Sequence, residues 1–76
     1  MNTNNIVERA LFEVMRREGT MNPQAAVARL LGVSAQAVSA WKKKGRVPVE
    51  RVLKLSELSG LPPHEIRPDI YPATTN

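Results

Sequence analysis

The chain has 76 residues, with eleven Lys and Arg against seven Asp and Glu, one His and no Cys. A domain of this size buries only about 60% of the surface that its unfolded chain exposes, so we expect one domain without a deep enclosed active site. The lack of cysteine excludes a disulfide framework, a thiolate zinc site, an iron–sulfur cluster and a cysteine nucleophile. No segment approaches the roughly 20 apolar residues of a membrane span, and no apolar run of signal-peptide length opens the chain, so we expect a soluble, cytoplasmic protein.

The net charge of +4 is concentrated in the middle of the chain. Residues 1–28 hold equal numbers of bases and acids, and residues 55–76 are mildly acidic, whereas residues 29–54 have Glu50 as their only acid. The bases of that middle segment are Arg29, Lys42, Lys43, Lys44, Arg46, Arg51 and Lys54. A local basic patch is typical of a protein that binds a polyanion, but a lysine run at a helix end is also favoured by the helix dipole.

Helical periodicity predicts two helices in the first part of the chain. The first runs from about Asn4 to Glu18, with Thr3 as its N-cap and Gly19 as its end. Its apolar stripe consists of Val7, Ala10, Leu11 and Val14. The second begins at Asn22-Pro23, where Asn can cap the free amides and Pro suits the first helical position, and it ends at Gly32.

Two further helices are predicted after Gly32. Ser34 caps the third, which buries Val38 and Trp41 and ends at Gly45. Pro48 opens the fourth, which Gly60 ends. Its predicted buried face consists of Val49, Val52, Leu53, Leu55 and Leu58. No segment alternates as a strand does, so we expect an all-α fold of four to five helices.

The last part of the chain contains four prolines, which preclude a long regular element. Residues 64–66 are predicted to form one helical turn after the proline pair. Ile66, Ile70 and Tyr71 are apolar enough to fold back onto the core or to meet another subunit. We therefore expect a single domain over residues 1–72, and a disordered tail over residues 73–76.

Residues 24–43, QAAVARLLGVSAQAVSAWKK, carry a helix-turn-helix signature, in which two short helices flank a turn that begins with Gly32. Ala28 lies where the helices cross, and a larger side chain there would push them apart. Glycine at position 32 allows the left-handed backbone that ends the first helix, and Val33 fills the corner. An ordinary helical hairpin in a bundle would also place Ala, Val and Leu at such spacing.

The outward face of the third helix is small and polar, because Val38 and Trp41 bury the opposite face. This outward face consists of Ala35, Gln36, Ser39, Ala40 and Lys43. Small side chains allow a helix backbone to lie deep in the major groove, which is about 12 Å wide. Together with the basic cluster that follows, this face predicts a DNA-binding role.

Two segments resemble the Cro/YdaS-type family of small phage and prophage regulators within the lambda-repressor-like helix-turn-helix superfamily. They are LLGVSAQAVSAWKKKGRVPVERV at residues 30–52 and HEIRPDIYP at residues 64–72. The resemblance covers about residues 21–72, and it departs from the family pattern at Asn22-Pro23. It implies an all-helical domain whose third helix enters the major groove and which represses transcription at operators, commonly as a dimer.

Each side chain has an expected role in such a fold. Gln24 is predicted to bond a phosphate beside the amides of its helix N-terminus. Gln36 is the predicted base-reading residue, because glutamine pairs bidentately with adenine N6 and N7. The other predicted contacts are Ser34 to phosphate, Ser39 to a base edge or phosphate, Ala35 and Ala40 to thymine methyl groups, and Lys43, Lys44, Arg46 and, more weakly, Arg51 to phosphates.

We expect no enzyme, no metal site and no cofactor. His64 is the only histidine, and it lies beside Glu65 in a turn bounded by prolines. With Asp69 these residues lack a second nitrogen or sulfur ligand, and the glycines are scattered helix ends rather than a phosphate-binding loop.

The function predicted is sequence-specific binding of double-stranded DNA by a Cro-like repressor of phage or prophage origin, at the nucleoid of a bacterial cytoplasm. The partners predicted are an operator and a second copy of the chain, which meets the first through the tail or through the fourth helix. Two alternatives stay open. One is an antitoxin-like autoregulator encoded beside a toxin. The other is a protein-interaction adaptor that uses Ile66, Ile70, Tyr71 and the exposed side of the first helix.

Overall fold

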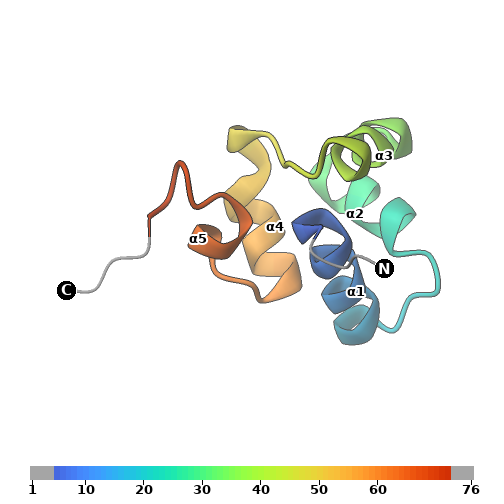
Figure 1. Ribbon diagram of the computed structural model, residues 1–76. Coiled ribbons are helices and arrows are strands. Elements are labelled where there is room, and N and C mark those ends of the chain that lie inside the picture. Colours follow the sequence, from blue (N-terminus) through green and yellow to red (C-terminus); the bar gives the residue numbers. More distant parts are fainter. Residues whose placement is uncertain (1–4, 73–76) are drawn as a thin grey trace.

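Five α-helices and one short 3₁₀ helix make up the regular structure of residues 5–72, the part of the chain that this computed structural model describes (Figure 1). In chain order they are α1 (Ile6–Glu18), α2 (Pro23–Leu31), α3 (Ala35–Lys44), η1 (Val49–Arg51), α4 (Val52–Ser59) and α5 (Pro63–Ile66). No strand occurs in residues 5–72, which confirms the predicted all-α class. The predicted tail, residues 73–76, lies outside the described residues. Figure 1 shows α3 and α5 at opposite ends of the molecule, with α1, α2 and α4 between them.

The start of α1 differs from the prediction. Its N-cap is Asn5, whose side-chain oxygen accepts hydrogen bonds from the backbone N–H groups of Val7 and Glu8. The helix therefore begins at Ile6 rather than Asn4, and the predicted cap, Thr3, lies outside the described residues. The Asn5 side-chain nitrogen also donates to the Lys42 carbonyl oxygen at 2.8 Å. Asn5 thus joins the start of α1 to the end of α3.

The ends of α2 and α3 agree with the prediction. The Asn22 side chain accepts from the Ala25 N–H, and Pro23 occupies the first turn of α2. The Ser34 hydroxyl oxygen accepts from the Ala37 N–H at 3.0 Å, so it caps α3. Gly32, with φ of 74°, adopts the left-handed conformation that ends α2 and that other residues reach only with strain.

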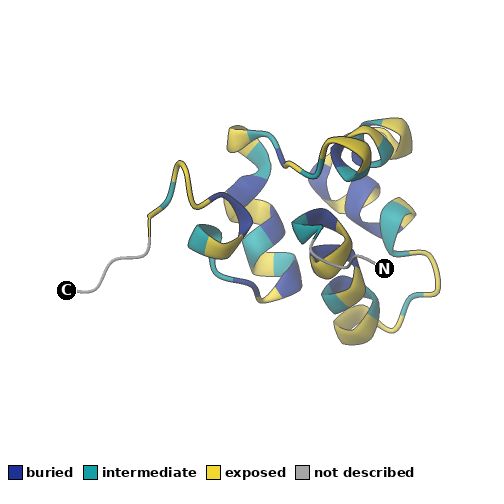
Figure 2. Ribbon diagram, in the orientation of Figure 1, coloured by how far each residue is buried: buried dark blue, intermediate teal, exposed yellow. Residues whose placement is uncertain are grey.

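The core gathers one stripe from each helix, and Figure 2 shows these buried stripes facing inward. Its buried residues are Val7, Ala10, Leu11, Val14, Val27, Ala28, Leu31, Val38, Trp41, Val47, Val52, Leu55, Leu61 and Ile66. Leu58 packs against this cluster from the side. The apolar residues predicted as buried in the first and third helices all lie in the core, and so does Ala28 at the helix crossing.

Two residues predicted on the buried face of the fourth helix are instead exposed. Val49 is 42% exposed and Leu53 is 55% exposed. Leu53 lies inside α4, one position after Val52 and two before Leu55, so at about 3.6 residues per turn it projects away from the buried face, which consists of Val52, Leu55 and Ser59. Val49 lies in the 3₁₀ turn η1 before α4 begins, and no residue of that turn is buried.

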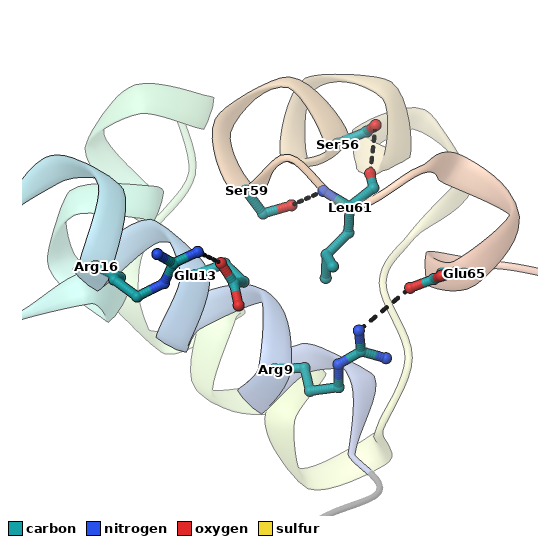
Figure 3. A network of polar contacts seen from close by, with 7 residues as sticks. All are labelled: Arg9, Glu13, Arg16, Ser56, Ser59, Leu61 and Glu65. Atoms are coloured by element: carbon teal, nitrogen blue, oxygen red, sulfur yellow. Dashed lines mark hydrogen bonds and ion pairs between the residues drawn. The ribbon is translucent and has the colours of Figure 1, made fainter.

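Polar contacts join α1 and the end of α4 to the segment that follows (Figure 3). Ser56 donates to the Leu61 carbonyl oxygen at 2.6 Å, and the Leu61 N–H donates to the buried Ser59 hydroxyl at 3.2 Å. Arg9 of α1 pairs with Glu65 of α5 at 3.2 Å. These contacts turn the chain sharply so that α5 packs on the core.

The predicted helical turn after the proline pair is confirmed as α5, and Ile66 folds back onto the core with 2% of its surface exposed. Tyr71 also packs partly against the core, whereas Ile70 is 41% exposed. Of the three apolar residues of this segment, two therefore complete the core.

Replacement of Leu55 by Ala should lower the free energy of unfolding by about 2–5 kcal/mol, because it leaves a cavity in the core. The matched control is Leu53→Ala, which lies on the exposed side of the same helix and should change that free energy by no more than about 0.5 kcal/mol. Denaturant unfolding followed by circular dichroism measures both values. Equal losses from the two variants would contradict the assignment of the buried face.

Candidate nucleic-acid interface

The pair formed by α2 and α3 has the geometry of a helix-turn-helix. Ala28 is buried where the two helices cross, with 6% of its surface exposed. The Val33 N–H donates to the Ala28 carbonyl oxygen at 2.9 Å, and the Val33 side chain packs against the core at the corner. The turn is therefore closed by backbone hydrogen bonds and by an apolar plug, as its residues predict.

The predicted contact residues of α3 lie together on its outward side. Ala35, Gln36, Ala40, Lys43 and Lys44 are exposed, and Ser39 is partly buried. Beneath them, Val38 and Trp41 fix the opposite side of the helix in the core. Within residues 5–72, the side chains of Gln36, Lys43 and Lys44 form no hydrogen bond or ion pair with another described residue. These side chains are therefore free to contact a ligand.

Gln24 connects the start of α2 to the start of α3. Its side-chain nitrogen donates to the Ala35 carbonyl oxygen at 3.0 Å. This bond uses one N–H of the amide and leaves the other N–H and the side-chain oxygen available. The predicted phosphate contact of Gln24 would therefore come from an amide whose orientation is already fixed relative to α3.

Ser34 has a structural role, because it caps α3 at the edge of the outward face. Its hydroxyl oxygen accepts the cap hydrogen bond, so the hydroxyl hydrogen can still be donated. Arg51, predicted as a weaker phosphate contact, donates from its guanidinium to the Leu31 carbonyl oxygen at 3.3 Å. This contact places Arg51 at the C-terminal end of α2, where a cation also suits the helix dipole.

Arg46 lies exposed in the loop after α3, and a buried arginine holds that loop in place. The Arg67 guanidinium donates to the carbonyl oxygen of Val47, the next residue after Arg46, at 2.7 Å. The same guanidinium bonds both carboxylate oxygens of Asp69, at 3.0 and 2.7 Å. The C-terminal segment thereby fixes the backbone beside Arg46.

Arg67 is not among the functional residues that the sequence predicts. The available signal is the spacing of Arg67 and Asp69 around Pro68, which brings a cation and a carboxylate together in a tight turn. That spacing does not indicate the third partner, the Val47 carbonyl oxygen, which lies 20 residues earlier in the chain.

The contact between Arg67 and Asp69 favours the charged forms of both side chains. The hydrogen bonds from Arg67, opposed in part by desolvation, lower the pKa of Asp69 from its ordinary 3.8 to about 2. The charges of Arg67 and Arg46 add to this lowering. Asp69 in turn raises the pKa of Arg67, chiefly through their hydrogen bond. Asp69 is therefore ionised at neutral pH, and it lies close enough to Arg46 for the charge of Arg46 to favour this ionised form.

Residues 5–72 contain no cluster of three His, Cys, Asp or Glu side chains that could hold a metal ion. None of the described helices has both the length and the apolar character needed to cross a bilayer.

The fold and its outward α3 face define a small helix-turn-helix protein. The model of the protein family described as "Bacterial toxin YdaS" matches residues 19–75, so the chain belongs to this family. The match covers α2, α3, α4 and α5, and it agrees with the YdaS part of the resemblance found in the sequence. No curated protein and no solved structure matches the chain.

Acidification should lower the stability of the folded protein, because it protonates Asp69. Because its folded pKa is about 2 and its ordinary value is 3.8, the stabilisation by Asp69 is complete above the higher value and is lost as the pH falls toward the lower one. Asp69→Asn should lower the melting temperature at pH 6 and flatten its decline between about pH 4 and pH 2.

Thermal melts followed by circular dichroism across that pH range measure this effect. Glu57→Gln is the matched control, because Glu57 is an exposed carboxylate of α4 with no ion pair among the described residues. If Asp69→Asn and Glu57→Gln gave the same pH profile, the contribution of the Arg67–Asp69 pair to folding would be refuted.

Proposed function

We propose that the chain is a sequence-specific DNA-binding transcriptional regulator that places α3 in the major groove of an operator. The observation that carries the proposal is the outward face of α3, which is small, polar and cationic and whose side chains are free of partners among the described residues. A helix with small side chains can approach the base edges closely, and exposed lysines neutralise phosphates. Membership of the YdaS family is compatible with a small helix-turn-helix regulator.

In this proposal Gln36 reads an adenine, because its amide can donate to N7 and accept from N6–H at once. Ala35 and Ala40 contact thymine methyl groups, and Ser39 reaches a base edge or a phosphate. Phosphates on the two sides of the groove are held by two groups of residues. These are Gln24 and Ser34 near the start of α3, and Lys43, Lys44 and Arg46 near its end.

Gln24 gives this arrangement a defined register. Its hydrogen bond to the Ala35 carbonyl oxygen joins a phosphate-binding position to the first residue of the reading helix. Phosphate contacts fix the orientation of a protein on the duplex, and base contacts then read the sequence. A displacement of Gln24 would therefore shift the position of Gln36 over the bases.

The regulator would act as a repressor and as a homodimer on its operator, in the cytoplasm of a bacterial host at the nucleoid. A two-fold dimer places its reading helices about 34 Å apart, on half-sites about 10 bp centre to centre. The proposed function needs no catalysis, cofactor or metal. A Cro-like role in a phage or prophage is the corresponding biological setting.

The family description supports a second candidate function. Because the family is described as a bacterial toxin, the chain could instead act in a toxin–antitoxin setting, with a protein as its target or partner. Induced expression in a bacterial host distinguishes the two roles when growth and operator occupancy are measured together. Growth arrest that persists in a variant without DNA binding would favour the toxin role.

Lys43→Ala should weaken binding to all duplex sequences and reduce the salt dependence of binding. With about three phosphate contacts per subunit, a dimer should show a slope of log affinity against log salt near −5, and the variant slope should be smaller by about 2. Gln36→Ala should instead relax preference at one base pair per half-site, by about 1–3 kcal/mol of discrimination.

Gel-shift titrations against the DNA upstream of the gene measure these effects. Arg17→Ala is the charge-matched control, because the Arg17 guanidinium lies over Gly60 at the end of α4 rather than on α3. Full operator affinity in both the Lys43 and the Gln36 variant would rule out the proposed docking of α3.

A further inference from the structure

A second surface lies along the flank of α3 and shares three residues, Ala40, Lys44 and Arg46, with the DNA contacts proposed above. It is a hollow of about 340 Å³ lined by Ala37, Ala40, Trp41, Lys44, Arg46 and Pro48. The four α3 residues recur at helical spacing, so they form one wall, and the loop that follows α3 forms the other. We call this hollow the Trp41 groove.

The Trp41 groove combines an apolar interior with a cationic rim. The apolar residues of its lining are Ala37, Ala40, Trp41 and Pro48, and the short side chains of the two alanines fill little space. Lys44 and Arg46 are exposed at the rim, and neither forms an ion pair within residues 5–72. Asp69 lies near Arg46, but its two oxygens are bound by Arg67.

Trp41 is one of the residues that line the hollow, although only 8% of its surface is exposed. Its indole N–H donates to no residue in the described part of the chain. A group that enters the hollow therefore lies close to Trp41.

We propose that the Trp41 groove docks an acidic protein segment that inserts one large apolar side chain between flanking carboxylates. Filling the hollow with an apolar group removes apolar surface from water, and the carboxylates pair with Lys44 and Arg46. Duplex DNA satisfies only the second requirement, because its phosphates match the cations whereas its bases stay stacked in the helix. The observed combination of shape and charge therefore fits a protein segment better than a DNA strand.

The docked segment would exclude DNA. Ala40, Lys44 and Arg46 belong both to the Trp41 groove and to the predicted DNA contacts. This competition rests on the proposed function, whereas docking of the segment does not. A partner of this kind would release the regulator from its operator without any change of fold.

Trp41 allows a direct test, because it is the only tryptophan of the chain and its fluorescence reports on the groove. The probe is a synthetic twelve-residue peptide of glutamates and serines with one central phenylalanine. One control peptide has serine in place of the phenylalanine, and another has glutamine in place of every glutamate. We expect a saturable change in Trp41 emission with the probe, and at least tenfold weaker binding of each control peptide.

Variants of the protein locate the binding. Ala40→Leu fills the hollow from its exposed side and should weaken binding of the probe at least tenfold, whereas Ala25→Leu, on an exposed position of α2, should not. A double change of Lys44 and Arg46 to Gln should weaken binding of the acidic probe and leave binding of the glutamine control peptide unchanged. Circular dichroism confirms that each variant is folded.

The outcomes separate the two proposals. Displacement of bound duplex DNA by the probe would support both the docking and the competition. Binding of the probe by a protein that binds no DNA would support the docking and refute the proposed function. If duplex DNA altered Trp41 emission and no peptide did, or if neither did, the proposed docking would be overturned.

Discussion

Burial of Val38 and Trp41 anchors α3, and the rest of the candidate interface depends on this anchor. These are the only two buried residues of the helix. Its other residues are exposed or partly covered by neighbouring segments. A small domain buries little apolar surface, so apolar packing alone leaves a helix some freedom to move. Polar contacts must then restrict the position of the helix. Gln24 bonds the first residue of α3, and Asn5 bonds the carbonyl oxygen of Lys42 near its end. The helix is thus held by two apolar side chains underneath and by one amide side chain at each end.

The sequence predicts most helix ends because their signals are local. Asn22, Ser34 and Gly32 each act within a few residues of their own position, and each has its predicted role. The prediction is wrong at Val49 and Leu53, because it took every apolar residue of the segment as buried, whereas a helix buries only one stripe. Leu53 falls between the buried positions Val52 and Leu55, and Val49 falls in the 3₁₀ turn, of which no residue is buried.

The candidate site also has one part that local sequence signals predict and another that they do not. The outward face of α3 follows from which of its residues are buried, so Gln36 and Lys43 could be placed from the sequence. The hydrogen bonds from Asn5 to Lys42 and from Arg67 to Val47 join residues 37 and 20 positions apart, and nothing in the local pattern marks them. The Trp41 groove depends on the loop that these contacts position, so its shape could not be predicted either.

The contact between Arg67 and Val47 also bears on how the protein is made. The ribosome produces the chain from its N-terminus, so the helix-turn-helix is synthesised before the residue that secures the loop behind it. That loop reaches its final state only once Arg67 and Asp69 have left the exit tunnel. A nascent chain that has exposed only residues up to α4 therefore carries a basic surface whose last part is not yet fixed.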